Sequence, residues 1–245
     1  MKLYGLIGFP LGHSFSKQYF TQKFAKENIQ DCFFESFAIP SIDLFPELLL
    51  QNPTLKGLSV TIPYKEQVLK YVDTLSDEVK FIGATNSIKI ENGKLKAYNT
   101  DIIGFEETFI QKLQPNHKKA LVLGTGGASK AVQFVLRKLN IPFLLVTRSV
   151  KKEAGYISYE AIDKALLEEF TVIINCSPVG MFPNENECPK IPYELLNSMH
   201  YLYDLVYKPA KTLFLQKGEQ AGATILNGEE MLRIQAEASW TIWNN

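Results

Sequence analysis

The sequence predicts an α/β protein of two domains, and three features of the chain carry this prediction. Short β-branched and aliphatic runs alternate with longer segments in which apolar residues recur at helical spacing. This alternation is typical of βαβ units and of a mainly parallel sheet. A hairpin signal interrupts it in the first half only, and a glycine-rich turn joins a strand to a helix in the second half.

The expected strands are short and apolar, and the expected helices repeat their apolar residues about every 3.6 positions. The strands cover residues 3–8, 33–39, 57–62, 120–123, 143–147, 172–175 and 201–205. The helices cover residues 16–27, 65–71, 105–113, 129–139, 211–220 and 229–243. Residues 87–91 and 94–98 flank Asn92-Gly93, which supplies the positive φ angles of a type I′ turn, so these two strands are expected to be antiparallel.

A polar stretch at residues 111–119 precedes the most regular of the expected strands. We therefore expect a domain change between residues 101 and 118. The first domain is predicted to span residues 1–101 and to be completed by the C-terminal helix at 228–245. The second domain is predicted to span residues 102–227.

The composition argues against several classes of protein. The 26 basic and 26 acidic side chains give a formal net charge of zero without a basic stripe, so nucleic acid is not an expected partner. Cys32, Cys176 and Cys188 are widely spaced and form no CxxC pair, so neither a disulfide framework nor a metal site is expected. The first apolar run is too short for a signal peptide and no stretch reaches membrane-spanning length, so we expect a cytoplasmic chain without a membrane partner.

The strand at residues 120–123 runs into a glycine-rich turn and then into a helical segment. The turn consists of Gly124, Thr125, Gly126, Gly127, Ala128 and Ser129. The first glycine allows a tight turn, the second lets the backbone approach a pyrophosphate, and the helix N-terminus attracts that anion. Ser129 replaces the third glycine of the usual pattern and is small enough for close packing. The pattern predicts a Rossmann-like, dinucleotide-binding domain, and the alternative is a purely structural glycine turn.

The residues that follow the strand at 143–147 indicate which dinucleotide is bound. NAD enzymes place Asp or Glu at this point, where the carboxylate binds the ribose hydroxyls. Here the residues are Thr147, Arg148, Ser149, Lys151 and Lys152, and no acid appears before Glu153. Cations and hydroxyls suit a 2′-phosphate, so the sequence favours NADP over NAD. The alternative is a solvated basic turn.

Polar clusters in the first half of the chain are candidates for a chemical site. Ser14 and Ser16 lie at the start of an expected helix, Lys65 lies just past a strand end, and Asp101 lies at a turn into a helix. Taken singly, each has a structural explanation, because hydroxyls and carboxylates often cap helices and a lone lysine is usually solvated.

Together with the glycine loop, these clusters resemble the shikimate dehydrogenase family in both order and spacing, from near residue 1 to Trp240. The matching stretches are 13–16, 60–66, 83–87, 99–101, 124–129, 175–181, 203–207 and 231–236. The resemblance implies an N-terminal α/β substrate domain, a Rossmann-like NADP-binding domain and a cleft between them. It also implies the reversible, NADP-dependent reduction of 3-dehydroshikimate to shikimate in aromatic amino acid and chorismate biosynthesis, by a monomer or homodimer.

The resemblance further implies roles for individual residues. Lys65 and Asp101 would form the catalytic pair that transfers a proton, and both would also contact ring hydroxyls. The substrate would be bound by Ser14, Ser16, Thr61, Asn86, Tyr207 and Gln235, with the two serines at its carboxylate. NADP would be bound by Gly124, Thr125, Gly126, Gly127, Ala128, Thr147, Arg148, Ser149, Lys152, Leu205 and Gly228.

Three departures from the family pattern bear on specificity. Ser59 stands where the family usually has Asn, and Glu229-Glu230 replaces a more apolar pair. The stretch 151–170 is short, so a helix after the second Rossmann strand is expected to be trimmed. The alternatives are a quinate/shikimate dehydrogenase of broader specificity and a non-catalytic NADP-binding regulator on the same fold. The intact catalytic pair argues against the regulator, and the hydroxyl-binding motifs do not suggest the pterin pocket of a related folate dehydrogenase.

Overall fold

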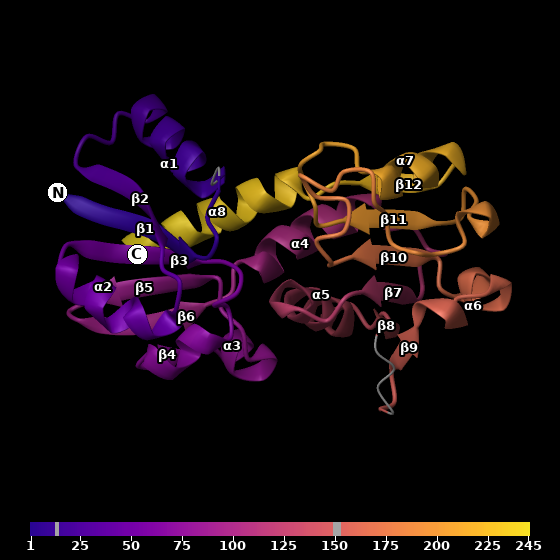
Figure 1. The fold of residues 1–245 in the computed structure, drawn as a ribbon, viewed down its shortest axis with the longest axis horizontal. Helices are drawn as coiled ribbons and strands as arrows, with labels where there is room; N and C mark the ends of the chain where they lie inside the picture. The colour runs from indigo at the N-terminus through magenta and orange to yellow at the C-terminus, as the bar shows by residue number, and fades with distance from the viewer. Residues whose placement is uncertain (13–14, 149–152) are drawn as a thin grey trace. The chain divides into compact units, whose positions relative to one another are not determined.

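The computed structural model describes residues 1–12, 15–148 and 153–245 and contains two six-stranded sheets (Figure 1). The chain divides into two compact units, one made of Met1–Thr100 with Gln235–Asn245 and the other of Asp101–Ile234. One sheet is mixed and the other is wholly parallel, with helices packed on both, which confirms the predicted α/β fold class. The assignment of the entire C-terminal helix to a substrate domain stays a prediction.

The first unit is built on a sheet with parallel strands at one side and antiparallel strands in the middle. Its order is β2-β1-β3-β5-β6-β4. The strands are β1 (Lys2–Gly8), β2 (Cys32–Ala38), β3 (Leu55–Val60), β4 (Thr74–Leu75), β5 (Ser87–Glu91) and β6 (Lys94–Tyr98). Strands β5 and β6 form the predicted antiparallel hairpin, and Asn92 and Gly93 have the positive φ angles, 50° and 73°, that its turn requires.

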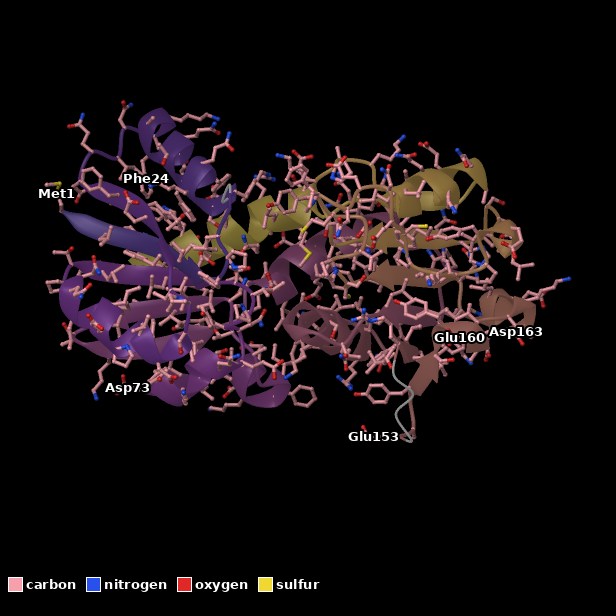
Figure 2. The ribbon with its side chains drawn as sticks, viewed as in Figure 1. Met1, Phe24, Asp73, Glu153, Glu160 and Asp163 are labelled. Atoms are coloured by element: carbon pink, nitrogen blue, oxygen red, sulfur yellow. The ribbon has the colours of Figure 1, made fainter. Side chains whose placement is uncertain are left out.

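The helices of this unit are α1 (Phe15–Lys26), α2 (Phe45–Gln51), α3 (Asp77–Ile82) and the C-terminal part of α8 (Glu229–Asn244). Aromatic side chains pack two of them, α1 and α8, against the sheet. Phe20 of α1 stacks on Phe34 of β2, with 4.6 Å between ring centroids, and Trp243 of α8 stacks on Tyr4 of β1 at 5.4 Å. Phe24 belongs to the same buried cluster (Figure 2). Burial of these rings fixes α1 and the end of α8 on the sheet.

The predicted helix over residues 65–71 is wrong in its first turn. The structure has a turn there, followed by a 3₁₀ helix that begins only at Gln67. An α-helix starting at Lys65 would use the Lys65 carbonyl as the acceptor for Leu69 N. Instead, the Lys65 carbonyl accepts from Thr85 N at 2.8 Å, and Leu69 N donates to Glu66 O at 3.2 Å. A distant segment, just before β5, therefore takes the acceptor that a local helix would need.

The second unit has a parallel sheet in the order β12-β11-β10-β7-β8-β9. The strands are β7 (Ala120–Leu123), β8 (Phe143–Thr147), β9 (Tyr156–Ser158), β10 (Val172–Asn175), β11 (Tyr201–Asp204) and β12 (Thr224–Leu226). Its helices are α4 (Asp101–Phe109), α5 (Gly127–Lys138), α6 (Lys164–Glu169) and α7 (Leu213–Gln220). The order reverses between β7 and β10, and doubly wound sheets bind their ligands beyond the carboxyl ends of the strands at such a point.

The stretch 151–170, in which a trimmed helix is expected, contains among its described residues the short strand β9 and the six-residue helix α6. Residues 151 and 152 of this stretch lie outside the described residues. On α5, the Arg137 guanidinium lies 5.0 Å from the Phe143 ring centroid and covers this ring at the start of β8.

The described residues include no helix that is both long and apolar enough to cross a bilayer. Nor do they group three or more His, Cys, Asp or Glu side chains in a way that could hold a metal ion. The cysteines are free thiols, and Cys32 is buried.

Two buried histidines, His117 and His200, are held in their neutral form near the amino ends of the strands of the second sheet. Nδ1 of each ring accepts a backbone N–H, from Gln114 at 3.0 Å and from Asn197 at 3.1 Å. His200 Nε2 lies 3.1 Å from the Leu167 carbonyl, to which it donates. Burial is the main cause that lowers the pKa of both rings below the ordinary value.

The folded protein is therefore expected to lose stability in mild acid. Because the histidine pKa values are lowered by folding, the unfolded chain binds more protons below about pH 6.5, so this stability is present above that pH and is lost as the pH falls. Between about pH 7 and about pH 5 the unfolding temperature of the wild type should fall more steeply than that of His117→Gln/His200→Gln. Parallel pH profiles of the two proteins would contradict this expectation.

Candidate functional site

The turn after β7 forms a backbone cradle that suits a phosphate group. Gly124 has a φ of 101°, and a Cβ there would lie 3.3 Å from Ser177 N. Around Gly126, no described atom lies within 4 Å of the position that a Cβ would take, so the backbone is open to an approaching group. Gly126 is also the N-cap of α5, and it provides no side-chain cap. The first N–H groups of a helix lack intrahelical partners and attract anions, so these residues fit a pyrophosphate.

Ser129 explains how this loop works without its third glycine. The side chain is fully buried in the first turn of α5. Its hydroxyl donates to the Gly126 carbonyl at 2.7 Å, and its backbone N–H donates to the same oxygen at 2.9 Å. The serine is small enough for close helix–strand packing and also fixes the turn that precedes the helix.

A second glycine, Gly228, makes a close backbone contact with the segment that follows β11. Gly228 N donates to the Val206 carbonyl at 3.3 Å. A Cβ on Gly228 would overlap the carbonyl oxygen of Leu205, so a larger residue would push the two segments apart. The structure thus brings the predicted cofactor residues Leu205 and Gly228 together.

The predicted 2′-phosphate residues are only partly described. Thr147 is the last residue of β8 and is buried, whereas Arg148 is exposed. Burial raises the pKa of Tyr159, and the nearby Arg148 charge opposes that rise. Ser149, Lys151 and Lys152 lie outside the described residues.

Asn86 and Gln235, two of the predicted substrate residues, meet in a buried network of the first unit. Asn86 Nδ2 donates to Gln235 Oε1 at 3.1 Å and to Thr100 Oγ1 at 3.0 Å. Asn86 Oδ1 accepts from Thr100 N at 2.7 Å, and Thr100 Oγ1 lies 3.0 Å from Ser239 Oγ. These bonds fix Gln235, near the middle of α8, against the start of β5.

Thr61 and Lys65 lie near Asn86 on the backbone that follows β3. Val60 N donates to the Asn86 carbonyl at 2.8 Å, and Lys65 O accepts from Thr85 N. Thr61 N donates to the Ile7 carbonyl at 3.0 Å, which holds the threonine beside the end of β1. Thr61 and Lys65 are both partly buried.

The remaining predicted site residues are distributed over both units. Ser16 lies in the first turn of α1, and Ser14 lies outside the described residues. Asp101 is the buried first residue of α4. Tyr207 follows β11 and is half-buried, and burial raises the pKa of its hydroxyl.

Several buried polar residues without a predicted role are connected to these sites by hydrogen bonds in the structure. In the first unit they are Thr100 and Ser239, which complete the Asn86 network. In the second unit, Asn175 and Asp204 end neighbouring strands and are hydrogen-bonded to each other. A usable signal was present, because each of these two polar residues follows a run of apolar or aromatic residues within an expected strand.

Comparison with known proteins gives a consistent result along the chain. The family model of the shikimate dehydrogenase substrate binding domain matches residues 6–88. A shikimate dehydrogenase (NADP(+)) of Caldanaerobacter subterraneus subsp. tengcongensis is 34% identical and aligns with 99% of this chain and 91% of its own.

Solved structures agree with the sequence match. A chorismate mutase/shikimate 5-dehydrogenase fusion protein from Clostridium acetobutylicum is 35% identical, with a TM-score of 0.89 over 99% of this chain and 91% of that chain. Shikimate 5-dehydrogenase from Thermus thermophilus, solved in complex with NADP(H) and shikimate, is 29% identical, with a TM-score of 0.85 over 99% and 93%.

Proposed function

Because the chain belongs to the shikimate dehydrogenase family, we propose that it catalyses the reversible NADP-dependent reduction of 3-dehydroshikimate to shikimate. The reaction would serve chorismate and aromatic amino acid biosynthesis. The observation that carries the proposal is the 34% identity over 99% of the chain to a shikimate dehydrogenase (NADP(+)). A cytoplasmic location and a monomeric or homodimeric state stay predictions from the sequence.

The glycine cradle of the second unit supports dinucleotide binding. The open backbone at Gly126 and the N-terminus of α5 suit a pyrophosphate, and the close approach of Gly228 to Leu205 forms a second backbone surface. When bound, NADPH supplies the hydride. The residues proposed to hold it are Gly124, Thr125, Gly126, Gly127, Ala128, Thr147, Arg148, Ser149, Lys152, Leu205 and Gly228.

Lys65 and Asp101 are proposed as the proton-transfer pair. Reduction of a ketone places a proton on its oxygen, and an ammonium group can donate that proton while stabilising the developing negative charge. The Asp101 carboxylate would orient the lysine and relay the proton. Neither residue belongs to the glycine cradle, so the chemistry and the cofactor contacts can be tested separately.

Hydrogen-bonding side chains are proposed to bind the substrate. Ser14 and Ser16 would bind the carboxylate, with Tyr207 nearby. Thr61, Asn86 and Gln235 would bind ring hydroxyls. Because Asn86 donates to Gln235 Oε1, the amide of Gln235 has a fixed orientation before a ligand arrives. A site built in this way rejects analogues that lack a hydroxyl, because its buried polar groups are then left unpaired.

Arg148→Ala is expected to erode the preference for NADP over NAD. A guanidinium binds a phosphate through a planar pair of donors, and charge-assisted bonds of this kind contribute about 1.5–3 kcal/mol. The variant should raise the KM for NADPH roughly 10-fold or more, with a smaller change for NADH. The measurement is kcat/KM for both cofactors in wild type and variant. A ratio that does not move would mean that the basic turn is only solvated surface.

The substrate is tested by comparing shikimate and quinate as substrates for oxidation with NADP⁺. The proposed function predicts a higher kcat/KM for shikimate. Comparable values would favour a quinate/shikimate dehydrogenase of broader specificity. The reason to consider this alternative is Ser59, which stands where the family usually has Asn.

A further inference from the structure

Asp204, the last residue of β11, is a fully buried carboxylate with no counter-ion among the described residues. Three donors surround it instead. Oδ1 accepts from Asn175 Nδ2 at 2.9 Å and from Val206 N at 3.0 Å, and Oδ2 accepts from Thr212 Oγ1 at 2.5 Å. A buried charge without a cation is costly, so its partners must compensate through hydrogen bonds.

The three donors come from three different segments of the second unit. Asn175 ends β10, Val206 lies in the turn after β11, and Thr212 is the N-cap of α7. The Thr212 hydroxyl also accepts from Leu215 N at 3.4 Å, so its hydrogen is directed to Asp204. One carboxylate therefore connects the ends of two neighbouring strands with the start of a helix.

The network continues from Asp204 to the glycine cradle. Asn175 Oδ1 accepts from Ser177 Oγ at 2.6 Å and from Ser177 N at 3.1 Å. Ser177 N in turn lies 3.3 Å from the position that a Cβ on Gly124 would take. Asn175 is paired in register with Leu123 of β7 on one side and with Asp204 of β11 on the other. The Asp204 network therefore lies directly beside the turn that begins at Gly124.

A second branch of the hydrogen-bond network reaches Gly228. Val206 donates its N–H to Asp204, and its carbonyl accepts from Gly228 N. The same turn contains Leu205, whose carbonyl lies against Gly228. Both backbone surfaces assigned to the cofactor are consequently connected to one buried side chain.

We propose that Asp204 is a positioning residue for NADP binding, which holds the turns after β7, β10 and β11 in their binding geometry. This inference rests on the proposed function, because it assumes that the glycine cradle binds the dinucleotide. An asparagine at this position would present one oxygen and one NH₂ group. It could accept from Asn175 and Val206, but its NH₂ group would then face the Thr212 hydroxyl, which would lose its acceptor and would have to accept instead of donate.

The charge state of Asp204 gives a readout that a purely structural residue would not give. Burial raises its pKa to about 6, against the opposing effect of its three hydrogen bonds, so the carboxylate is mainly ionised at neutral pH. The titratable neighbours that feel its charge are Cys176 and Tyr193, and burial raises the pKa of both. Protonation of Asp204 removes its charge and turns one of its acceptors into a donor, which weakens the network.

The test compares Asp204→Asn with Asp163→Asn in the full-length protein. Asp163 lies on the same unit (Figure 2), is exposed, and caps α6 by accepting from Leu166 N at 2.9 Å, so the control removes a carboxylate that serves only a helix. NADPH affinity is measured by fluorescence titration between about pH 5 and about pH 8. Asp204→Asn should bind NADPH about 10- to 100-fold more weakly at neutral pH, and the control should match wild type.

The pH profile separates positioning from simple destabilisation. NADPH affinity of the wild type and of Asp163→Asn should fall more steeply as the pH drops through about 6 than that of Asp204→Asn, whose side chain does not titrate. The KM for NADPH should rise in Asp204→Asn more than kcat falls. Equal affinities of the two Asn variants, or identical pH slopes, would overturn the proposal.

Two further comparisons keep the result decisive. If Asp204→Asn does not fold, Thr212→Val, which removes one donor, should weaken NADPH binding, whereas Thr212→Ser, which keeps the hydroxyl, should not; equal binding by both would overturn the proposal. A wild type that binds no NADPH would overturn the proposed function, and this proposal with it. A wild type that binds NADPH beside an equally tight Asp204→Asn overturns this proposal alone.

Discussion

Replacing Lys65 with alanine is expected to lower kcat for 3-dehydroshikimate reduction by about 10²- to 10⁴-fold, the usual contribution of a positioned proton donor. NADPH binding should stay close to wild type, because Lys65 belongs to the Met1–Thr100 unit, whereas the glycine cradle belongs to the Asp101–Ile234 unit. The two quantities are measured by steady-state turnover and by NADPH titration.

Lys70→Ala is the matched control for this prediction. Lys70 lies five positions further along, is exposed, and pairs with Asp43 at 2.9 Å, so its removal should leave turnover unchanged. If Lys65→Ala kept the turnover of Lys70→Ala, Lys65 would be another surface lysine and the proposed proton-transfer role would be lost.

Trp243→Ala is expected to lower the free energy of unfolding of the first unit by about 3–5 kcal/mol. Trp243 is buried, stacks on Tyr4 and lies 5.5 Å from the Phe20 ring centroid. Its indole also covers Gly57, where a Cβ would overlap it. Removing the ring leaves a cavity beneath the end of α8. The same helix carries Gln235, so the KM for the substrate should rise as well.

Trp240→Ala provides the comparison, because Trp240 is on the same helix but only partly buried. The free energy of unfolding should fall by less in Trp240→Ala than in Trp243→Ala. Chemical denaturation of both variants, followed by tryptophan fluorescence and by NADPH binding, reports on the two units separately. A loss of less than about 1 kcal/mol for Trp243→Ala would contradict the role assigned to the ring.

Features encoded by neighbouring residues could be predicted from the sequence. The hairpin around Asn92-Gly93 and the glycine turn before α5 each depend on residues next to one another, and the structure confirms both. Other short elements were missed, although α3 has a Ser76 cap and ends at Gly83 with a φ of 65°. Its six residues are too few to show a helical period.

Features that depend on contacts between residues far apart in the chain could not be predicted from the sequence. The helix expected from residue 65 fails because Thr85 takes the Lys65 carbonyl, a contact that only the folded sheet creates. The partners of Asn86 are likewise separated along the chain, since Gln235 lies 149 residues away. Motifs identified the candidate residues, but only the strand order shows which strand ends are adjacent. The Asp204 network is of this kind, and its roles in binding stay predictions.

The most direct test of the central claim is the consumption of NADPH by the purified wild-type protein on addition of 3-dehydroshikimate, with the product identified. NADPH is expected to be oxidised only when the protein and 3-dehydroshikimate are both present, with one shikimate formed for each NADPH consumed. A protein that binds NADPH tightly but neither oxidises it with 3-dehydroshikimate nor forms shikimate would contradict the proposed function and would favour a non-catalytic regulator.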